Sequence, residues 1–269
     1  MSMVEFLGCF LITIGPVLVL FFMTIAHDPI LVILCIARLA NFAFFWMLSL
    51  LVSSAWWLFF DVIIFKTKSV VGFGVVFAVL FQEMFRFLLF KLMKKAEHGL
   101  KTVWRSDSLF VNDNQLAYVA GLGFGSIHCI FNMVNLLAAM FGPGTAGLRG
   151  HSYDFFITSS FLSLGFLLLN ILWGIIFFHG FRWGLYHQPV IVLISHFMVS
   201  ACSILSFQFG VAWSIMLTLA MVISMAFYTY KVLGGSWQLL KRSFKFTEAF
   251  WYPSSSSSST AAQPEDKAE

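Results

Sequence analysis

Long apolar segments recur along this chain, and they constrain its fold more than any other feature. Each is close to the length of about 20 apolar residues that a helix needs to cross a bilayer. The segments are Phe6–Ala26, Ile30–Leu58, Val70–Leu89, Leu116–Met140, Phe155–Phe178, Val190–Ser206 and Val211–Leu233. Only 10% of the residues are charged, against about 25% in a typical soluble domain. The sequence therefore predicts an all-α, polytopic membrane protein with seven transmembrane helices.

The basic residues between these segments predict the orientation of the chain. One side of the membrane receives the first, third and fifth connections and the C-terminal tail, which carry Lys91, Lys94, Lys95, Lys101, Arg105, Arg182, Lys231, Lys241, Arg242 and Lys245. The opposite side carries Lys66, Lys68 and Arg149. Because cytoplasmic connections are enriched in Lys and Arg, we expect a cytoplasmic C-terminus and a lumenal or extracellular N-terminus.

The composition changes near residue 246 and predicts two parts. Residues 1–246 hold every apolar segment and are expected to form the transmembrane domain. Residues 247–269 are polar and include a run of six serines, a composition that cannot bury enough apolar surface to fold. We therefore expect a disordered cytoplasmic tail. The net charge of +4 follows from the cytoplasmic connections and does not indicate a nucleic-acid partner.

The third apolar segment contains an acid and a base at a depth where ionisable groups are costly. Glu83 and Arg86 are three residues apart, so they share one face of a helix and can pair. Such groups usually face a protein interior or a water-filled cavity. Asn170 and His196 place further polar groups on two other segments, and Gln82 precedes Glu83. These five residues are predicted to form a buried polar network that fixes the positions of the helices.

The fourth segment carries a stripe of small residues. Gly121 and Gly125 are four apart, and Cys129 extends the stripe by one turn. Small residues at this spacing let another helix approach closely, which favours helix association inside a membrane. The spacing alone leaves two alternatives open. The stripe packs against another helix of the same chain, or it contacts a partner subunit.

Arg38 is an unusual residue in the second segment, because it interrupts a long apolar run. It is followed one turn later by Asn41. Either its side chain snorkels to the interface, or the membrane-spanning part of the segment begins later. We favour the later start, because the run from Phe42 to Leu58 is almost long enough to span alone.

The residues in the apolar segments do not support catalysis by this chain alone. A catalytic zinc site needs three protein ligands, a bound water and a nearby general base. Glu83 and His196 supply two ligands, amides such as Asn170 are poor zinc ligands, and Gln82 stands where a second carboxylate could act as a base. Ser126 and His128 lie on one segment and do not form a nucleophile and base on facing helices. We predict no catalytic, cofactor-binding or metal-binding residue.

The sequence alone also allows two other functions for this chain. An intramembrane metallohydrolase is suggested by Glu83 and His196, and near-stoichiometric zinc in pure protein would favour it. A seven-span receptor is allowed by the topology, although the sequence has no outer cysteines placed for a disulfide and no N-terminal ligand-binding domain.

Short motifs in a fixed order give the chain a resemblance to one family. The motifs are Gly15-Pro16, Asp28-Pro29, Phe44-Phe45-Trp46, Ser49-Leu50-Leu51, Gln82-Glu83-Met84-Phe85-Arg86-Phe87, Lys91-Leu92-Met93-Lys94-Lys95-Ala96, Tyr118-Val119-Ala120-Gly121-Leu122-Gly123-Phe124-Gly125, Gly142-Pro143-Gly144-Thr145, Trp173-Gly174, Ser195-His196 and Gly234-Gly235-Ser236. From about Phe6 to Ser243 the chain resembles the anterior-pharynx-defective-1 family, the seven-span scaffold subunit of gamma-secretase.

The resemblance implies a non-catalytic scaffold that works in an assembly. The implied partners are presenilin, which supplies the two catalytic aspartates, nicastrin and the presenilin-enhancer subunit. The implied complex cleaves single-span proteins such as Notch and the amyloid precursor protein in the endoplasmic reticulum, Golgi and plasma membrane. The family's glycine stripe is needed for assembly, so Gly121 and Gly125 inherit that role by resemblance, which favours the partner-contact alternative for the stripe.

Three features depart from the family pattern. The family usually has a glycine at the position of Cys129, which predicts looser packing by one turn here. It usually has a histidine at the position of Asn170, so hydrogen bonding around His196 is expected to differ. The second segment is about one helical turn longer than in the family, and the excess includes Arg38. These departures are those of a divergent paralogue, either active or decayed.

Overall fold

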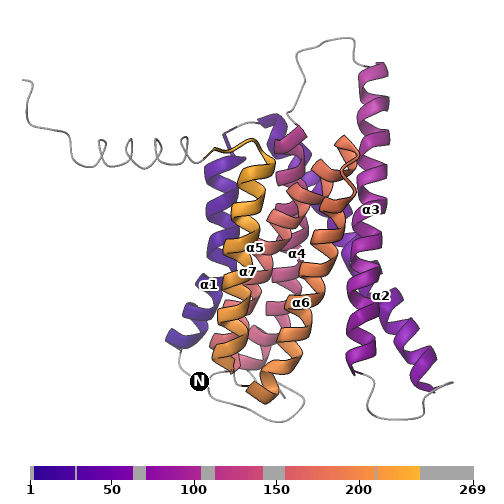
Figure 1. Ribbon diagram of the computed structural model, residues 1–269. Helices are drawn as coiled ribbons and strands as arrows, with labels where there is room; N and C mark the ends of the chain where they lie inside the picture. The colour runs from indigo at the N-terminus through magenta and orange to yellow at the C-terminus, as the bar shows by residue number, and fades with distance from the viewer. Residues whose placement is uncertain are drawn as a thin grey trace, which may run out of the picture. The chain divides into compact units, whose positions relative to one another are not determined.

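The computed structural model describes residues 3–27, 29–62, 71–103, 113–141, 155–209 and 211–236. Within these ranges all regular structure is helical, as predicted (Figure 1). The helices are α1 (Met3–Thr24), α2 (Pro29–Phe60), α3 (Val71–Val103), α4 (Asp113–Phe141), α5 (Phe155–Trp183), α6 (His187–Phe209) and α7 (Val211–Val232).

Six of the helices in the described part of the chain are long and apolar enough to cross a membrane. Their spans are Met3–Thr24, Asn41–Phe60, Phe73–Ala96, Asn114–Val134, Phe155–Trp183 and Ala212–Val232. The exception is α6, whose apolar stretch His187–Ser203 is shorter. The helical fold class is therefore confirmed, and six crossings rather than seven follow from helix length and composition.

The second helix extends well beyond its membrane span. It begins at Pro29, a residue suited to the first helical position because its missing N–H has no partner there in any case. The helix continues through the position of Arg38, and its membrane-length apolar part begins at Asn41. The Arg38 side chain lies outside the described residues.

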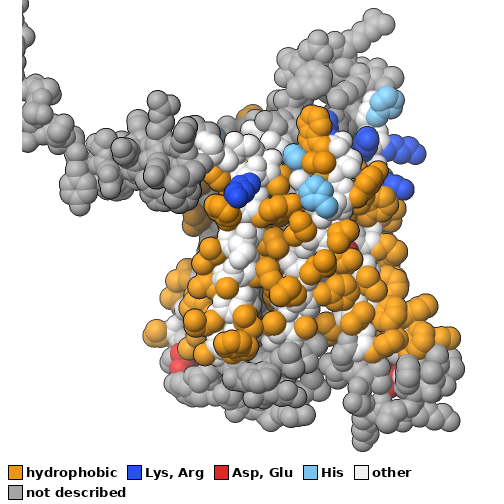
Figure 2. All heavy atoms as spheres, viewed as in Figure 1, with side chains coloured by type: hydrophobic (Ala, Val, Ile, Leu, Met, Phe, Trp, Pro, Cys, Tyr) orange, Lys and Arg blue, Asp and Glu red, His pale blue; other side chains and the backbone are white. Residues whose placement is uncertain are grey.

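Helices α4 and α5 occupy the centre of the first of two compact units, which spans residues 1–229. Both contact α1, and α4 also packs on α2 while α5 packs on α6. Two large side chains of α5, Leu167 and Trp173, are fully buried. Outside this centre, apolar side chains cover the middle of the face seen in Figure 2, and Lys and Arg gather towards the end where α3 finishes. That pattern is the one a lipid-facing surface requires.

A tight turn joins α5 to α6. Gly184 follows the last residue of α5 with φ of 70°, a conformation that costs glycine little. The Leu185 N–H donates to the Gly180 carbonyl at 2.8 Å, and the Gln188 N–H donates to the Leu185 carbonyl at 3.0 Å. The first bond is the one that closes a Schellman-type helix end, and the second lies at the start of α6. The short connection sets α5 and α6 side by side in opposite directions.

The second unit begins at Tyr230 and is described only as far as Ser236. Gly234 has φ of 83°, and the Gly235 N–H donates to the Tyr230 carbonyl at 2.8 Å, which ends α7 in the same way. The Tyr230 hydroxyl donates to the Ser236 carbonyl at 2.9 Å. The predicted polar tail, residues 247–269, and the predicted boundary at residue 246 lie outside the described residues.

Candidate functional site: a buried ion pair and a glycine seam

A buried ion pair lies on α3. Arg86 Nη1 donates to both carboxylate oxygens of Glu83, at 2.7 Å to Oε1 and 3.0 Å to Oε2. The two residues are only 2% and 7% exposed. Their spacing of three places them on one helical face, so the helix itself brings the charges together. Each charge offsets much of the other's desolvation cost.

The ion pair extends to α5 through Asn170. Arg86 Nη2 donates to Asn170 Oδ1 at 2.7 Å, and Asn170 Nδ2 donates to the Phe166 carbonyl one turn earlier at 2.8 Å. The amide therefore accepts from a cation and donates to a carbonyl, which fixes the orientation of its oxygen and nitrogen. Asn170 thus connects α3 to α5.

The same ion pair reaches α6 through His196. The ring nitrogen Nδ1 of His196 lies 2.7 Å from Glu83 Oε1. An ionised carboxylate can only accept hydrogen bonds, so Nδ1 of His196 carries the proton and donates this bond to Glu83 Oε1. The imidazole also stacks on Trp173 of α5, with ring centroids 4.5 Å apart and 27° between the planes. His196 is thereby held between α3 and α5.

Aromatic rings cover the remaining face of the Arg86 guanidinium. Its central carbon lies 4.9 Å from the ring centroid of Phe124 on α4 and 5.8 Å from that of Trp173. Such cation–π contacts stabilise a desolvated cation. The buried cluster, which we define as Glu83, Arg86, Asn170 and His196, therefore touches four helices.

Gln82 is placed differently from the other four predicted network residues. Its side chain is buried, and it precedes Glu83 on α3. Among the described residues, the hydrogen bonds that connect the four cluster side chains do not include Gln82. The structure thus brings Glu83, Arg86, Asn170 and His196 together and leaves Gln82 beside them.

Gly121 and Gly125 of α4 both face α5. A Cβ added at Gly121 would lie 2.8 Å from the Cα and the carbonyl oxygen of Ile171, and one added at Gly125 would lie 2.9 Å from the Leu167 carbonyl oxygen. Gly174 matches them from α5, because its added Cβ would lie 2.7 Å from the Cα of Gly121. Gly174 was not predicted as part of the stripe, although the Trp173-Gly174 pair was visible as a motif. We call this contact, formed by Gly121, Gly125 and Gly174, the glycine seam.

Cys129 faces a different helix from the two glycines. Its side chain is fully buried, and its Sγ donates to the Thr13 carbonyl of α1 at 3.4 Å. Gly123 points to a third neighbour, since its added Cβ would lie 2.8 Å from the ring of Phe42 on α2. Helix α4 therefore uses small residues on three sides, and only the side with Gly121 and Gly125 meets α5.

His128 of α4, which was not predicted to belong to the polar network, is a half-buried residue whose two ring nitrogens are buried. The His128 ring packs against Trp46 and Phe166, with centroid distances of 5.6 and 5.2 Å. Neither of its nitrogens has a hydrogen-bond partner among the described residues. Its position on α4 beside a small-residue stripe gave no signal that it would be enclosed by aromatic rings.

The chemistry open to these residues is restricted by their mutual bonding. Both carboxylate oxygens of Glu83 are engaged by Arg86, and His196 uses Nδ1 on the same carboxylate. The Ser126 hydroxyl donates to the Leu122 carbonyl at 2.6 Å. Among the described residues, no group of three or more His, Cys, Asp or Glu side chains could hold a metal ion. The arrangement is suited to holding helices in register.

The fold and the buried cluster define a class: a multi-pass α-helical membrane protein whose central helices are tied by an internal ion pair and a glycine seam. The family model described as Aph-1 protein matches residues 4–236. The chain belongs to the Aph-1 family.

Curated relatives match nearly the whole chain. Gamma-secretase subunit Aph-1 of Drosophila melanogaster is 39% identical over 245 residues, which cover 91% of this chain and 98% of that protein. Gamma-secretase subunit APH-1B of Homo sapiens is 39% identical over 249 residues, covering 90% and 93%. Gamma-secretase subunit APH1-like of Arabidopsis thaliana is 29% identical over 212 residues, covering 77% and 83%.

Proposed function

We propose that this chain is a non-catalytic scaffold subunit of a gamma-secretase complex. Relatives that match about nine-tenths of the chain are named as subunits of that complex. The observation that carries the scaffold role is the saturation of Glu83, whose two oxygens are bound by Arg86 and one of them also by His196. A carboxylate held in this way serves poorly as a general base or nucleophile. It serves well as a fixed point between helices.

The proposed role is to hold partner subunits by presenting a rigid surface. The buried cluster and the glycine seam fix α3, α4, α5 and α6, while α1 and α7 expose large apolar side chains outward, among them Phe22 and Met216. Presenilin would supply the catalytic aspartates, and nicastrin and the presenilin-enhancer subunit would complete the assembly. Substrates would be single-span proteins such as Notch and the amyloid precursor protein, cleaved in the endoplasmic reticulum, Golgi and plasma membrane.

The two central motifs have different parts in this proposal. Gly121 and Gly125 pack inside the chain, so their contribution to assembly is indirect: they set the spacing of α4 and α5 on which the outer helices rest. Asn170 accepts a hydrogen bond from Arg86, which keeps α5 connected to the cluster. We therefore expect the chain to remain a working subunit with Asn170 at this position.

We further propose that α6 is the seventh crossing. The helix has 23 residues, which at 1.5 Å per residue gives about 34 Å, enough for a hydrocarbon core of about 30 Å. Its His196 bonds Glu83, which lies within the α3 span Phe73–Ala96. Seven crossings give a lumenal N-terminus and a cytoplasmic C-terminus, as the charge distribution predicts. Glycosylation sequons engineered at each terminus of the full chain test this. We expect modification at the N-terminus alone; modification at both ends, at neither end or at the C-terminus alone contradicts the proposal.

Co-purification from cells tests the scaffold role. A tagged chain is extracted in a mild detergent, and the bound proteins are quantified by mass spectrometry. We expect presenilin and nicastrin in near-equal amounts with the chain. A chain that purifies alone and stably folded would contradict the proposal, and zinc analysis of that material would then test the metallohydrolase alternative.

Two variants sharpen the experiment. His196→Ala should reduce the recovered presenilin several-fold while the amount of chain inserted in the membrane stays near normal. Gly121→Leu should abolish co-purification without abolishing insertion, because the side chain would collide with the α5 backbone. Gly8→Leu is a comparison for the same change, since nothing lies within 4 Å of a Cβ added at Gly8. Normal assembly of Gly121→Leu would contradict the role of the seam.

A further inference from the structure

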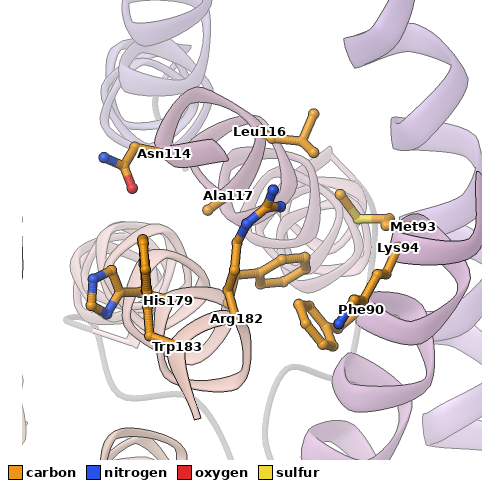
Figure 3. Close-up of a pocket in the computed structure, with 10 residues that line it drawn as sticks. Phe90, Met93, Lys94, Asn114, Leu116, Ala117, His179, Arg182 and Trp183 are labelled. Carbon is orange, nitrogen blue, oxygen red and sulfur yellow. The ribbon is translucent and has the colours of Figure 1, made fainter. Parts of the chain in front are cut away.

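A cavity opens between α3, α4 and α5, away from the buried cluster. It encloses about 40 Å³, and its lining combines cationic, amide and aromatic side chains (Figure 3). A single water occupies about 10–15 Å³ on this measure. The space therefore admits a tetrahedral oxyanion, or an equivalent small headgroup, rather than one water.

The cavity lies at the level where apolar spans end. The α3 span ends at Ala96, the α4 span begins at Asn114 and the α5 span ends at Trp183. Asn114 and Trp183 themselves line the cavity. Trp183 and the nearby Tyr186 are 69% and 68% exposed, and exposed Trp and Tyr side chains are enriched at the membrane–water interface. The cavity is thus placed at the depth of lipid headgroups.

Two cations from neighbouring helices line this cavity. Lys94 comes from α3 and Arg182 from the last turn of α5. In Figure 3 the two lie on opposite sides of Phe90, and the Arg182 side chain extends towards Leu116 and Ala117 of α4. A guanidinium and an ammonium group that line one cavity from two helices are suited to a phosphate.

Apart from His179, the remaining side chains that line the cavity are apolar. Phe90 and Phe178 meet edge to face with centroids 5.4 Å apart. The cavity therefore has a cationic rim and an aromatic floor, which match an amphipathic molecule. A soluble phosphate would use only the rim.

The position of Arg182 is fixed by the helix end that carries it. His179 Nδ1 and Gln188 Oε1 are 2.9 Å apart, which ties the last turns of α5 to the start of α6. The turn at Gly184 holds the same helix end. A rim that is held in place before binding loses less entropy when a ligand arrives.

We propose that this cavity binds the phosphate of an anionic glycerophospholipid, with Lys94 and Arg182 on the headgroup and an acyl chain passing over Phe90 towards the hydrocarbon. Lys91, which is exposed on α3 one turn before Lys94, adds positive charge to the same helix. This site is independent of the proposed scaffold role, because it uses none of the buried cluster or the glycine seam.

Lipid retention by the purified full chain tests the site. The chain is delipidated in mild detergent, and native mass spectrometry measures the binding of phosphatidylserine and of phosphatidylcholine. We expect the anionic lipid to bind more tightly. Each cation near a headgroup contributes about 1 kcal/mol, so the Lys94→Gln/Arg182→Gln double variant should weaken phosphatidylserine binding about 30-fold. Lys95→Gln, which removes the same charge from the next residue of the same helix, should change binding about twofold or less.

Three results would overturn the assignment. The first is equal phosphatidylserine binding by the double variant and by Lys95→Gln. The second is equal binding of the two lipids by the unaltered chain. The third is displacement of the lipid by millimolar inorganic phosphate, which would make a soluble phosphate the ligand. Should the double variant unfold, Lys94→Gln alone decides, because its side chain is exposed and a loss of about fivefold is still measurable.

Discussion

Helices α1 and α4 are both membrane-length helices with glycines in their spans, two in α1 and three in α4, yet they occupy opposite environments. In α1 only 11% of the span is buried inside the protein, whereas in α4 the share is 67%. A Cβ added at Gly8 or Gly15 of α1 would meet nothing within 4 Å, but one added at Gly121 or Gly125 of α4 would meet the α5 backbone.

This difference shows what marks a core inside a membrane. The α1 span is more apolar than the α4 span although it is less buried, and the α5 span is nearly as apolar as that of α1 yet 61% buried. Apolar character alone therefore does not mark burial in protein. Helices in a bilayer associate through close packing and polar contacts, because lipid tails are as apolar as leucine. The centre of this molecule is accordingly built from glycines and an ion pair. Substitutions at these positions measure how strongly the stability of the chain depends on the glycines and the ion pair.

Removal of the carboxylate from the buried cluster should have the largest effect. Glu83→Leu leaves the Arg86 guanidinium buried without its counter-charge, which costs about 3–5 kcal/mol. We expect a large fall in the midpoint of thermal unfolding of the purified chain in mild detergent. The double variant Glu83→Leu/Arg86→Leu should recover much of that loss, since it removes both charges. A double variant no more stable than Glu83→Leu would show that the two charges are not coupled.

A single methyl group in the glycine seam should have the next largest effect. Gly121→Ala places a Cβ 2.8 Å from the Ile171 backbone, and overpacking of this kind costs about 1–3 kcal/mol, with the upper end expected where only backbone can move. Gly8→Ala makes the same change on α1 and should alter stability by less than about 1 kcal/mol. Equal unfolding midpoints for the two variants would remove the contrast between α1 and α4.

Loss of the imidazole hydrogen bond should have a smaller effect. His196→Phe keeps a ring that can stack on Trp173 but removes the bond to Glu83, and hydrogen bonds to charged groups contribute about 1.5–3 kcal/mol. Because Arg86 still holds both Glu83 oxygens, we expect a loss near the lower end of that range, again read from the unfolding midpoint. A loss as large as that of Glu83→Leu would mean that His196, rather than Arg86, is the main partner of the carboxylate.

The sequence predicted the helices well because apolar length is a local property. Six of the predicted spans recur as membrane-length helices, and α6 falls short by the same measure. The pairing of Glu83 with Arg86 was also local, set by a spacing of three on one helix. The contacts of Asn170 and His196 across helices depend on how α5 and α6 rotate, which no spacing within one segment specifies.

The small-residue stripe illustrates the limit of such reasoning. Gly121 and Cys129 are eight residues apart, and a period of four drifts around a helix of 3.6 residues per turn by about 80° over that distance. The two residues therefore meet different neighbours, α5 and α1. Gly174 could not be paired with Gly121 from the sequence, because their contact joins positions on separate helices.

Cys129 gives the smallest predicted effect and tests whether α1 belongs to the packed centre at all. Its Sγ bonds the Thr13 carbonyl, and the side chain is fully buried, so α1 is attached to α4 at this point although most of its span faces outward. Cys129→Ala removes one weak donor and about one heavy atom of packing, which should cost about 1 kcal/mol. Cys202→Ala, at a half-buried position on α6, should cost less.

Limited proteolysis near the α1 end together with the unfolding midpoint would separate two outcomes. Faster cleavage in Cys129→Ala alone would show that α1 is held by this contact, and unchanged cleavage would assign α1 to the lipid-facing periphery.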